Sequence, residues 1–287
     1  MIYIHQVGCI NYKEDQSVDL KAECKLVAPK FIRRTDDFIQ LGILGVEQIA
    51  KKTQVNPKTA LYLTSGQGNT GVFMRLCEQQ LITKVPPKPV DFINSLSNTA
   101  GFYISQFLNL ENKNNNLSHR GFVVEMGLLL AKSELLLNKE EWILLGGVDQ
   151  LLPSDDFNRC ILGLDESIPL GQGSNWMLLN KSSKAALARI DLTNKELDKT
   201  QLKTYLKQLG YQSHNTQLGF AMLTDKPVIA ELLMETGCKQ FDYQTNVGFY
   251  ETMAFYAINQ FVLNETGRLI FIDCFLDKYR VIDVNVL

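Results

Sequence analysis

Cysteine and histidine side chains carry out much of the nucleophilic and metal chemistry of proteins, and this sequence spaces both types widely. No two cysteines lie closer than 15 residues, so there is no Cys-x-x-Cys pair. The six are at positions 9, 24, 77, 160, 238 and 274. The three histidines, His5, His119 and His214, lack His-Glu-x-x-His spacing. We therefore predict buried, unreactive thiols, no metal site and no cofactor.

A glycine-rich turn follows a predicted strand at 60–65. Residues 66–71 read Gly-Gln-Gly-Asn-Thr-Gly, a pattern that lets a helix N-terminus approach a pyrophosphate. A dinucleotide site also needs an acidic residue about 20 positions later, at the end of the next strand. Position 90 is Val90, and Asp91 opens the following segment instead. The pattern therefore favours a close-packed strand-to-helix turn.

Three segments in the first half form a more specific pattern. Residues 92–101 read Phe-Ile-Asn-Ser-Leu-Ser-Asn-Thr-Ala-Gly, 117–121 read Leu-Ser-His-Arg-Gly, and 146–149 read Gly-Gly-Val-Asp. Together they resemble a β-ketoacyl synthase of the thiolase superfamily. In that family a Ser-Thr-Ala-Cys elbow carries the nucleophile, and a later strand ends in Gly-Gly-x-Asp or Gly-Gly-x-Glu. The family's spacing of 25 residues (146 minus 121) puts Gly121 where the cysteine belongs.

The resemblance also implies two catalytic histidines and a glycine-rich gate, and this sequence matches none of them. Residues 224–227 read Thr-Asp-Lys-Pro where the family has His-Gly-Thr-Gly, and Thr245 takes the histidine position of the second motif. Residues 272–277 contain no glycine where the family has a Phe-Gly-Phe-Gly loop. Because Gly121 has no side chain to accept an acyl group, we predict no catalysis by this chain alone.

The segment 241–255, Phe-Asp-Tyr-Gln-Thr-Asn-Val-Gly-Phe-Tyr-Glu-Thr-Met-Ala-Phe, narrows the resemblance. It is similar to chain-length-factor-like subunits of aryl polyene and flexirubin pigment pathways. The resemblance implies a noncatalytic subunit that forms a heterodimer with an active ketosynthase. Such a complex would act in type II polyketide or fatty acid-like biosynthesis and receive its substrates from an acyl carrier protein.

In thiolase-fold dimers, by the same resemblance, the strand before the elbow pairs across the two-fold axis and the helix at 98–108 borders the partner's acyl tunnel. Phe102, Tyr103, Phe107 and Phe122 are then the candidate tunnel residues, since bulky aromatic rings limit the volume open to a linear acyl chain. Phe102 and Phe107 point about 140° apart on a helix of ~3.6 residues per turn, so at most one faces the tunnel. Tyr103 shares the face of Phe107.

Two other functions are open at this point. One is an active condensing or acyltransfer enzyme whose nucleophile has moved to Cys160 or Cys274, paired with His119 or His214. The other is a homodimeric module that binds acyl carrier protein through a basic patch. The patch residues are Lys30, Arg33, Arg34, Lys51 and Lys52.

Periodicity predicts alternating strands and helices in both halves. The first half has strands at 2–9, 60–65 and 142–148, a short strand ending at 117–118, and helices at 36–52, 70–81, 94–108 and from 121. The second has strands at 176–179, 186–191 and 218–223, helices at 195–209, 227–235 and 248–263, and a hairpin of 269–275 with 279–286. We predict an α/β thiolase-like layered fold of two duplicated halves, 1–150 and 151–287, packed as one unit.

Composition excludes several classes of protein. The 287 residues are 45% hydrophobic and 21% charged, as in globular proteins. A net charge of −2 gives no cationic field, so nucleic acid and membrane surfaces are not expected partners. The apolar stretch 121–131 is interrupted by Glu125 and is shorter than the ~20 residues that span a bilayer. The N-terminus reads as a strand without a signal peptide, which predicts a cytoplasmic protein.

Overall fold

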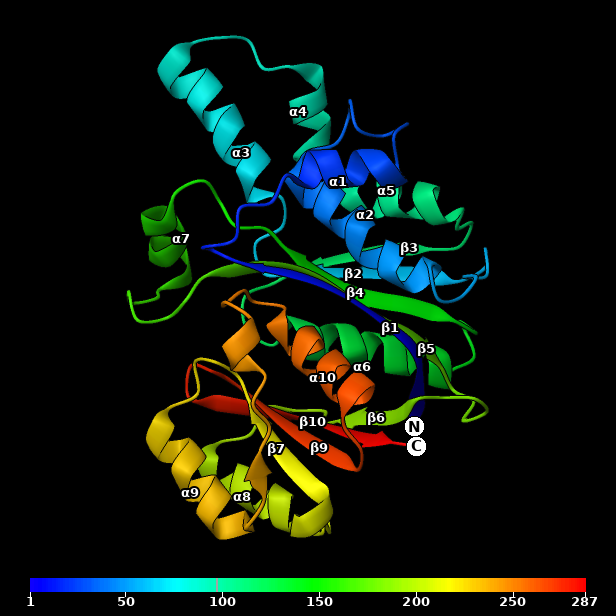
Figure 1. Cartoon of the computed structure of the whole chain (residues 1–287), viewed down its shortest axis with the longest axis vertical. Helices are drawn as coiled ribbons and strands as arrows, with labels where there is room; N and C mark the ends of the chain where they lie inside the picture. Colours follow the sequence, from blue (N-terminus) through cyan, green and yellow to red (C-terminus); the bar gives the residue numbers. More distant parts are fainter. Residues whose placement is uncertain (97) are drawn as a thin grey trace.

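The computed structural model describes residues 1–96 and 98–287, and it is built in five layers of helix and sheet (Figure 1). One sheet half contains, in spatial order, β3 (Asn114–Ser118), β2 (Ala60–Ser65), β4 (Ile143–Asp149), β5 (Gly171–Asn180) and β1 (Ile2–Lys13). It continues into β6 (Ala188–Leu192), β10 (Lys278–Val286), β9 (Arg268–Phe275), β7 (Thr216–Phe220) and β8 (Lys239–Gln240). Only Ile2–Ile4 of β1 pair with β6 at the junction.

The strand order repeats, which supports the predicted duplication. β2 is parallel to β3 and β4, just as β7 is parallel to β8 and β9. β5 and β10 then continue each half in the antiparallel sense. By this pairing the second repeat starts at β6. β5 therefore belongs to the sheet of the first half, although it follows the predicted boundary at residue 150.

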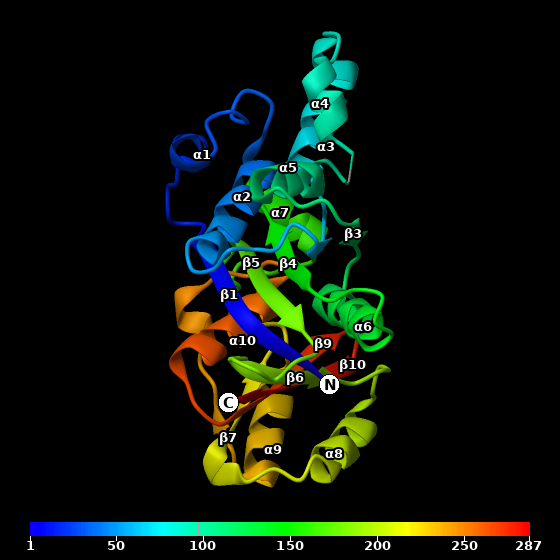
Figure 2. The ribbon, with the colours of Figure 1, turned by 90° about the vertical axis from the view of Figure 1, so that its right-hand side faces the viewer.

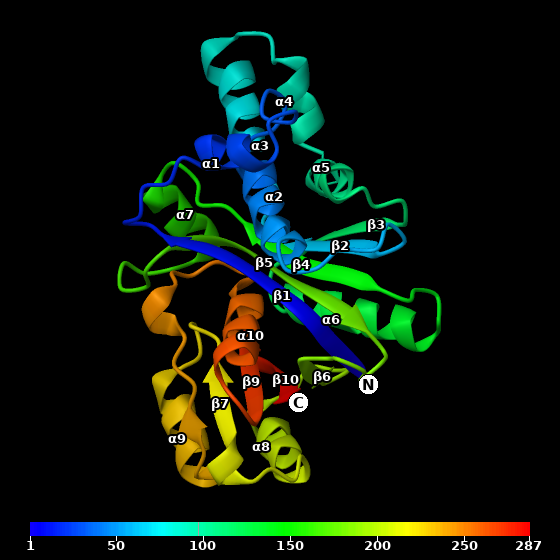
Figure 3. The same ribbon diagram turned by 45° about the vertical axis from the view of Figure 1, so that its right-hand side comes forward.

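Two buried helices form the middle layer (Figure 3). They are α6 (Val123–Leu136), between β3 and β4, and α10 (Met253–Asn264), between β8 and β9. α10 is apolar on nearly every face, which is typical of a helix covered on all sides. Their side chains form one core with the facing sides of both sheet halves.

The outer layers are α1 (Leu20–Val27), α2 (Asp37–Ala50) and α5 (Thr99–Leu108) on the first half, and α8 (Lys199–Gln208) and α9 (Lys226–Thr236) on the second. Each outer layer packs on its own apolar cluster. A helical arm projects from the first half (Figure 2). The arm consists of α3 (Thr70–Cys77), a π-helical turn (Glu78–Thr83) and α4 (Pro89–Asn94).

The structure confirms most predicted elements and changes a few. The helix predicted at 94–108 begins at Thr99 instead, and Asn94 ends the separate helix α4. Polar side chains bind backbone oxygens in this region: Ser95 Oγ donates to Phe92 O at 2.8 Å, and Thr99 Oγ1 to Ile93 O at 2.7 Å. The helices α1, α4 and α7 (Asp155–Leu162) were not predicted. Within the described residues, no helix is long and apolar enough to cross a bilayer.

Candidate functional site

The resemblance places the reacting position at a sharp turn between β3 and α6. Gly121 and Phe122 both have left-handed backbones, with φ of 74° and 53°. Glycine adopts this conformation freely, whereas a bulky aromatic residue rarely does. Phe122 is the N-cap of α6, and its side chain makes no capping hydrogen bond. The turn therefore presents the helix N-terminus without a polar cap.

An aromatic side chain from the second half fills the space beside this turn. Phe275 ends β9, and a Cβ atom added at Gly121 would overlap its ring. Phe122 packs edge-to-face on Phe275 with ring centroids 6.2 Å apart, and the Arg280 guanidinium carbon lies 5.5 Å from the centre of the Phe122 ring. A side chain at position 121 therefore needs Phe275 to move.

A cavity of about 70 Å³ lies next to Gly121. It is lined by Arg120, Gly121, Phe122, Leu162, Ala221, Leu223, Phe249, Glu251, Met253, Ala254, Phe271, Asp273, Cys274 and Phe275, with no histidine among them. A space of this size holds a few water molecules and is far smaller than the ~300–1,000 Å³ of small-molecule sites.

Asp149, the last residue of the Gly-Gly-x-Asp pattern, joins three elements above this cavity. Its carboxylate accepts hydrogen bonds from Ser65 Oγ (2.8 Å), Gly66 N (2.9 Å) and Thr252 N (2.8 Å). A Cβ atom at Gly147 would overlap Thr252, so β4 and the start of α10 are in close contact. Asp149 thereby connects the ends of β2 and β4 to the N-terminus of α10.

Glu251 lines the cavity and its carboxyl group is hard to ionise. Burial and, to a lesser extent, the nearby Asp149 charge raise its pKa to about 7, while Arg120 opposes the shift. Arg120 Nε lies 3.3 Å from Glu251 Oε1. Gly66 packs against the Glu251 side chain, and a Cβ atom at position 66 would overlap it. This close contact explains a glycine in the glycine-rich turn at 66–71.

Two more carboxyl groups lie below the turn. Glu125, in the first turn of α6, is fully buried, and neither of its oxygens has a hydrogen-bond donor. Burial raises its pKa well above the usual value, and Asp273 raises it further. Burial also raises the pKa of Asp273 to about 6. Both carboxyl groups are therefore harder to ionise than carboxyl groups in water.

The structure does not bring the other predicted reactive residues together. Thr245 is exposed in a short turn (Gln244–Asn246), where its carbonyl accepts from Lys13 Nζ. Burial raises the pKa of Cys274, which lines the cavity, to about 11. Cys160 is exposed on α7. Among the described residues, neither cysteine hydrogen-bonds to a histidine: His119 Nδ1 lies 3.1 Å from Gly121 O, and His214 is on the turn before β7.

The candidate tunnel residues of α5 lie on opposite faces, as their spacing predicts. Phe102 is 54% exposed, whereas Tyr103 is 9% exposed and packs on Phe31 with ring centroids 5.6 Å apart. Phe107 is half-buried against the outer core of the first half. Phe122 is buried against Phe275. Of the four, Phe102 is the one that an incoming chain or partner can reach.

The predicted basic patch is divided between the two ends of α2. Arg33 and Arg34 precede the helix, and Lys30 lies over the Phe31 ring. Lys51 pairs with Glu47 at 2.7 Å, and Lys52 Nζ donates to Val7 O at 3.1 Å, both near the C-terminal end. Fourteen residues at 1.5 Å each separate the ends by roughly 21 Å.

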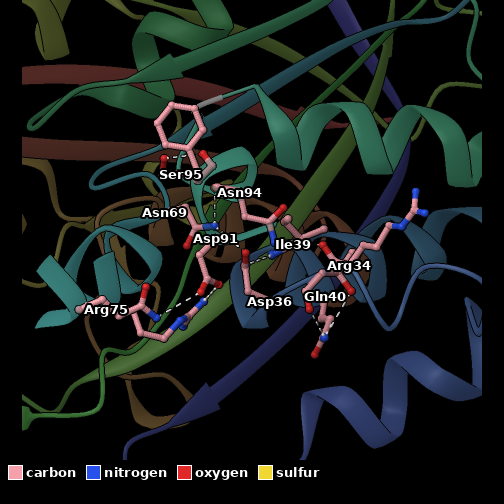
Figure 4. A network of polar contacts seen from close by, with 12 residues as sticks. Arg34, Asp36, Ile39, Gln40, Asn69, Arg75, Asp91, Asn94 and Ser95 are labelled. Atoms are coloured by element: carbon pink, nitrogen blue, oxygen red, sulfur yellow. Dashed lines mark hydrogen bonds and ion pairs between the residues drawn. The ribbon is translucent and has the colours of Figure 1, made fainter. Parts of the chain in front are cut away.

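A polar network fixes the turn after β2 (Figure 4). Asn69 Nδ2 donates to Asp36 Oδ2 at 2.9 Å and to Asn94 O at 3.0 Å. Arg75 of α3 pairs with Asp91 of α4 at 3.2 Å. These contacts hold α3, α4 and the start of α2 together, which supports the prediction of a close-packed turn.

Sequence reasoning missed Glu251, Asp273, Phe275 and Arg280 as residues of this site. Glu125, an acidic residue inside the apolar stretch 121–131, is the one feature of the sequence that could have indicated buried carboxyl groups at this site. Among the described residues, no group of three or more histidine, cysteine, aspartate or glutamate side chains is arranged to hold a metal ion.

Comparison with known proteins gives the fold. No protein-family model matches the sequence, and no curated protein sequence matches it. The chain is similar to the ishigamide ketosynthase/chain length factor, with a TM-score of 0.77 and 11% identity over 100% of this chain and 99% of that one. It is also similar to AntDE:AntF, a type II polyketide synthase acyl carrier protein in complex with its ketosynthase, with a TM-score of 0.74 and 12% identity over 100% and 99%.

A third similar structure is ketosynthase twelve of the Bacillus amyloliquefaciens bacillaene polyketide synthase, with a TM-score of 0.67 and 14% identity over 100% of this chain and 73% of that one. These similarities extend over the whole chain and both halves of the sheet. The duplicated sheet, the two central helices and the turn at Gly121 therefore belong to a thiolase-like fold, the fold of ketosynthases and chain length factors.

Proposed function

We propose that this chain is a noncatalytic, ketosynthase-like subunit that pairs with an active ketosynthase and shapes its acyl tunnel. The observation that carries the proposal is the Phe275 ring, which occupies the space that a side chain at Gly121 would need. An acyl-accepting nucleophile requires both a reactive atom and room for the acyl group. The cavity of about 70 Å³ has no room for an acyl group. Burial raises the pKa of the Cys274 thiol at its wall to about 11, so this thiol stays protonated at neutral pH.

Two exposed features support a partner subunit. β3 is an edge strand, so one side of its backbone can pair with another chain. The arm and α5 beside it expose an unusual number of large apolar side chains, which marks an interaction surface. They are Phe73, Leu81, Ile82, Val85, Phe92, Ile93, Leu96 and Phe102.

The pathway is a finer part of the same proposal. The resemblance of 241–255 favours aryl polyene or flexirubin biosynthesis within the type II polyketide class, with an acyl carrier protein that reaches this subunit through the complex. In the structure this segment supplies Phe249 and Glu251 to the cavity wall. Purification of the complex from its own pathway and identification of the chain it carries would test this part.

One mass measurement tests the central proposal. We expect the chain, co-expressed with the ketosynthase of its pathway, to give a 1:1 complex in native mass spectrometry. After incubation with acylated carrier protein, intact-mass analysis should find the acyl group on the ketosynthase alone. A stoichiometric adduct on this chain that disappears with Cys274→Ser or Cys160→Ser would establish the active-enzyme alternative instead. A chain that binds no ketosynthase and forms homodimers would favour the carrier-binding module.

The exposed face of α5 gives a prediction about product length. Phe102→Ala should lengthen the products of the assembled complex, because the ring is 54% exposed. The substitution also removes an edge-to-face contact with Tyr103, whose ring centroid lies 5.4 Å away. Tyr103→Ala should leave product length unchanged and destabilise the chain by about 3–5 kcal/mol, as for buried aromatic residues. Chromatographic profiles of products, together with thermal unfolding, separate the two effects. Unchanged products with Phe102→Ala in an active complex would contradict a tunnel role for this helix.

A further inference from the structure

The β9–β10 hairpin places charged side chains on the face that packs against the central layer. Side chains alternate along a strand, so Asp273 and Phe275 point to the same face of β9 as Phe271, which belongs to the central core. Arg280 is the cross-strand partner of Asp273 on β10 and shares this face. Glu125, in the first turn of α6, lies near both charges. The face that holds Phe275 against the start of α6 therefore also carries Asp273 and Arg280.

Glu125 has no donor that compensates for its burial. It is fully buried, and neither of its carboxyl oxygens accepts a hydrogen bond. A buried carboxylate without a donor is costly, so burial raises the pKa of Glu125 well above its usual value, and the Asp273 charge raises it further. Burial likewise raises the pKa of Asp273 to about 6. The contact between the hairpin and α6 therefore favours carboxyl groups that carry a proton.

Arg280 does not neutralise this pair of acids. Its Nη2 lies 3.7 Å from Glu196 Oε1, whereas its Nε and Nη1 have no hydrogen-bond partner among the described residues. Its guanidinium carbon lies 5.5 Å from the centre of the Phe122 ring. Arg280 lowers the pKa of Glu125, but burial and the Asp273 charge, which raise it, outweigh this effect. Ionisation of both acids would therefore leave two negative charges beside one guanidinium, away from water.

The other titratable groups around the hairpin do not change this balance. Glu251 and Arg120 line the cavity below the turn and pair with each other, with Arg120 Nε 3.3 Å from Glu251 Oε1. The Cys274 thiol at the same wall stays protonated near neutral pH, because burial raises its pKa to about 11. His119 and Lys278 lie at the turn and at the tip of the hairpin, but both are exposed, so solvent and salt screen their charges.

We propose that Glu125 and Asp273 form a proton-dependent latch between the two halves of the chain. While both carboxyl groups are protonated, the hairpin holds the Phe275 ring against Gly121 and Phe122, as in this structure. When Glu125 releases its proton to solvent, the closed contact offers its charge no donor, so the hairpin moves away from α6 and the carboxylate reaches water. The Phe275 ring moves with the hairpin and frees the space beside Gly121. The latch lies within this chain and does not depend on a partner subunit.

Hydrogen exchange of β9 and β10, followed by mass spectrometry on the chain alone, tests the latch. An opening that releases one proton becomes more frequent by up to about tenfold per pH unit. After correction for the intrinsic exchange rate, we therefore expect exchange of the hairpin to accelerate from about pH 7 to about pH 8.5. Glu125→Gln keeps the shape of the side chain and cannot ionise, so this acceleration should be absent. Glu141→Gln, at an exposed position, is the matched control and should retain it.

The amides of α2, which packs in the outer core of the first half, report opening of the whole chain and should exchange more slowly than the hairpin. The latch is overturned if hairpin and α2 exchange together at every pH, or if Glu125→Gln accelerates like the unmodified chain.

Asp273→Asn decides the question if Glu125→Gln does not fold, as judged by circular dichroism. It removes the charge that repels an ionised Glu125, so hairpin exchange at pH 8.5 should become slower than in the unmodified chain. Unchanged or faster exchange in folded Asp273→Asn protein would overturn the latch. Complex formation with a ketosynthase plays no part in this measurement, so a failure of the proposed function would leave the result intact.

Discussion

The two central helices occupy equivalent places in the duplicated fold, yet they begin in opposite ways. α10 begins at Met253, and the preceding Thr252 N–H donates to Asp149, whose carboxylate comes from the other half of the molecule. α6 begins after Phe122, which has a left-handed backbone and no capping partner. One helix start is joined to a carboxylate through the Thr252 backbone, and the other is surrounded by aromatic rings and a buried arginine.

The two helix starts therefore have different roles: one joins the halves of the molecule, and the other is where the resemblance places the reacting side chain. The bonded start of α10 joins both halves and needs the Asp149 carboxylate for that purpose. The resemblance places an acyl-accepting side chain at the start of α6, and there Phe275 occupies the space beside Gly121. The central layer is complete although a side chain at position 121 has no room.

Removal of Asp149 should have the largest effect on this arrangement. Asp149→Ala leaves three buried donors without an acceptor, so we expect a loss of about 3–5 kcal/mol in the free energy of unfolding. Asp149→Asn retains one acceptor oxygen and should cost less. Urea unfolding measures both, with the exposed Asp15→Ala as control. A loss below about 1 kcal/mol would mean that Asp149 does not hold the start of α10.

The crowded start of α6 should be less sensitive, and a double-mutant cycle isolates its cause. Gly121→Ala combines a positive φ with overlap on Phe275, and about 2–4 kcal/mol is expected from backbone strain plus overpacking. Phe275→Ala should recover part of that loss in the double variant, which measures the coupling.

Gly163→Ala is the matched control for this cycle. Gly163 ends α7 with φ of 69°, and an added Cβ would meet no atom within 4 Å, so only the backbone term of about 1–2 kcal/mol applies. Equal losses at Gly121 and Gly163, with no coupling to Phe275, would show that the ring does not block the turn. Thermal and urea unfolding of the four variants provide the values.

The comparison also shows what sequence could predict. The strand at 60–65, the hairpin of β9 and β10 and the helix after Gly121 follow from local periodicity, because each has a strong apolar pattern. α7 escaped prediction because its eight residues make only about two turns, which is too short for a periodic pattern to stand out, although four of the eight are apolar. The boundary at 150 rested on two predicted halves of similar length along the chain, whereas the repeat becomes visible in the order of paired strands.

The site was predictable in part for the same reason. Gly121 and the Gly-Gly-x-Asp spacing lie in one half and could be counted along the chain. Phe275, Glu251 and Arg280 reach the turn only when the second half folds against the first. The segment before α10 is irregular, with a short turn at Gln244–Asn246 and a bridge from Phe249 to Leu170, so counting does not tell which side chain faces the cavity. In the structure, Phe249 and Glu251 of this segment line the cavity, whereas Thr245 lies beside Lys13.

Per pH unit, the smallest expected effect is the pH dependence at Glu251. Its pKa is raised from the model-compound value of 4.5 to about 7, so between these values the folded chain holds a proton that the unfolded chain has released. The free energy of unfolding should therefore fall as pH rises from about 4.5 to about 7, by at most about 1.4 kcal/mol per pH unit for one proton, and level off above. Arg120 lies half exposed beside the carboxyl and reduces the slope. Glu251→Gln, neutral at every pH, should remove this part of the slope while Asp15→Asn retains it, and urea unfolding at a series of pH values measures both. An unchanged slope in Glu251→Gln would show that Glu251 does not cause the pH dependence. It would then come from the other buried carboxyl groups whose pKa is raised, which are Asp36, Glu125, Asp149 and Asp273.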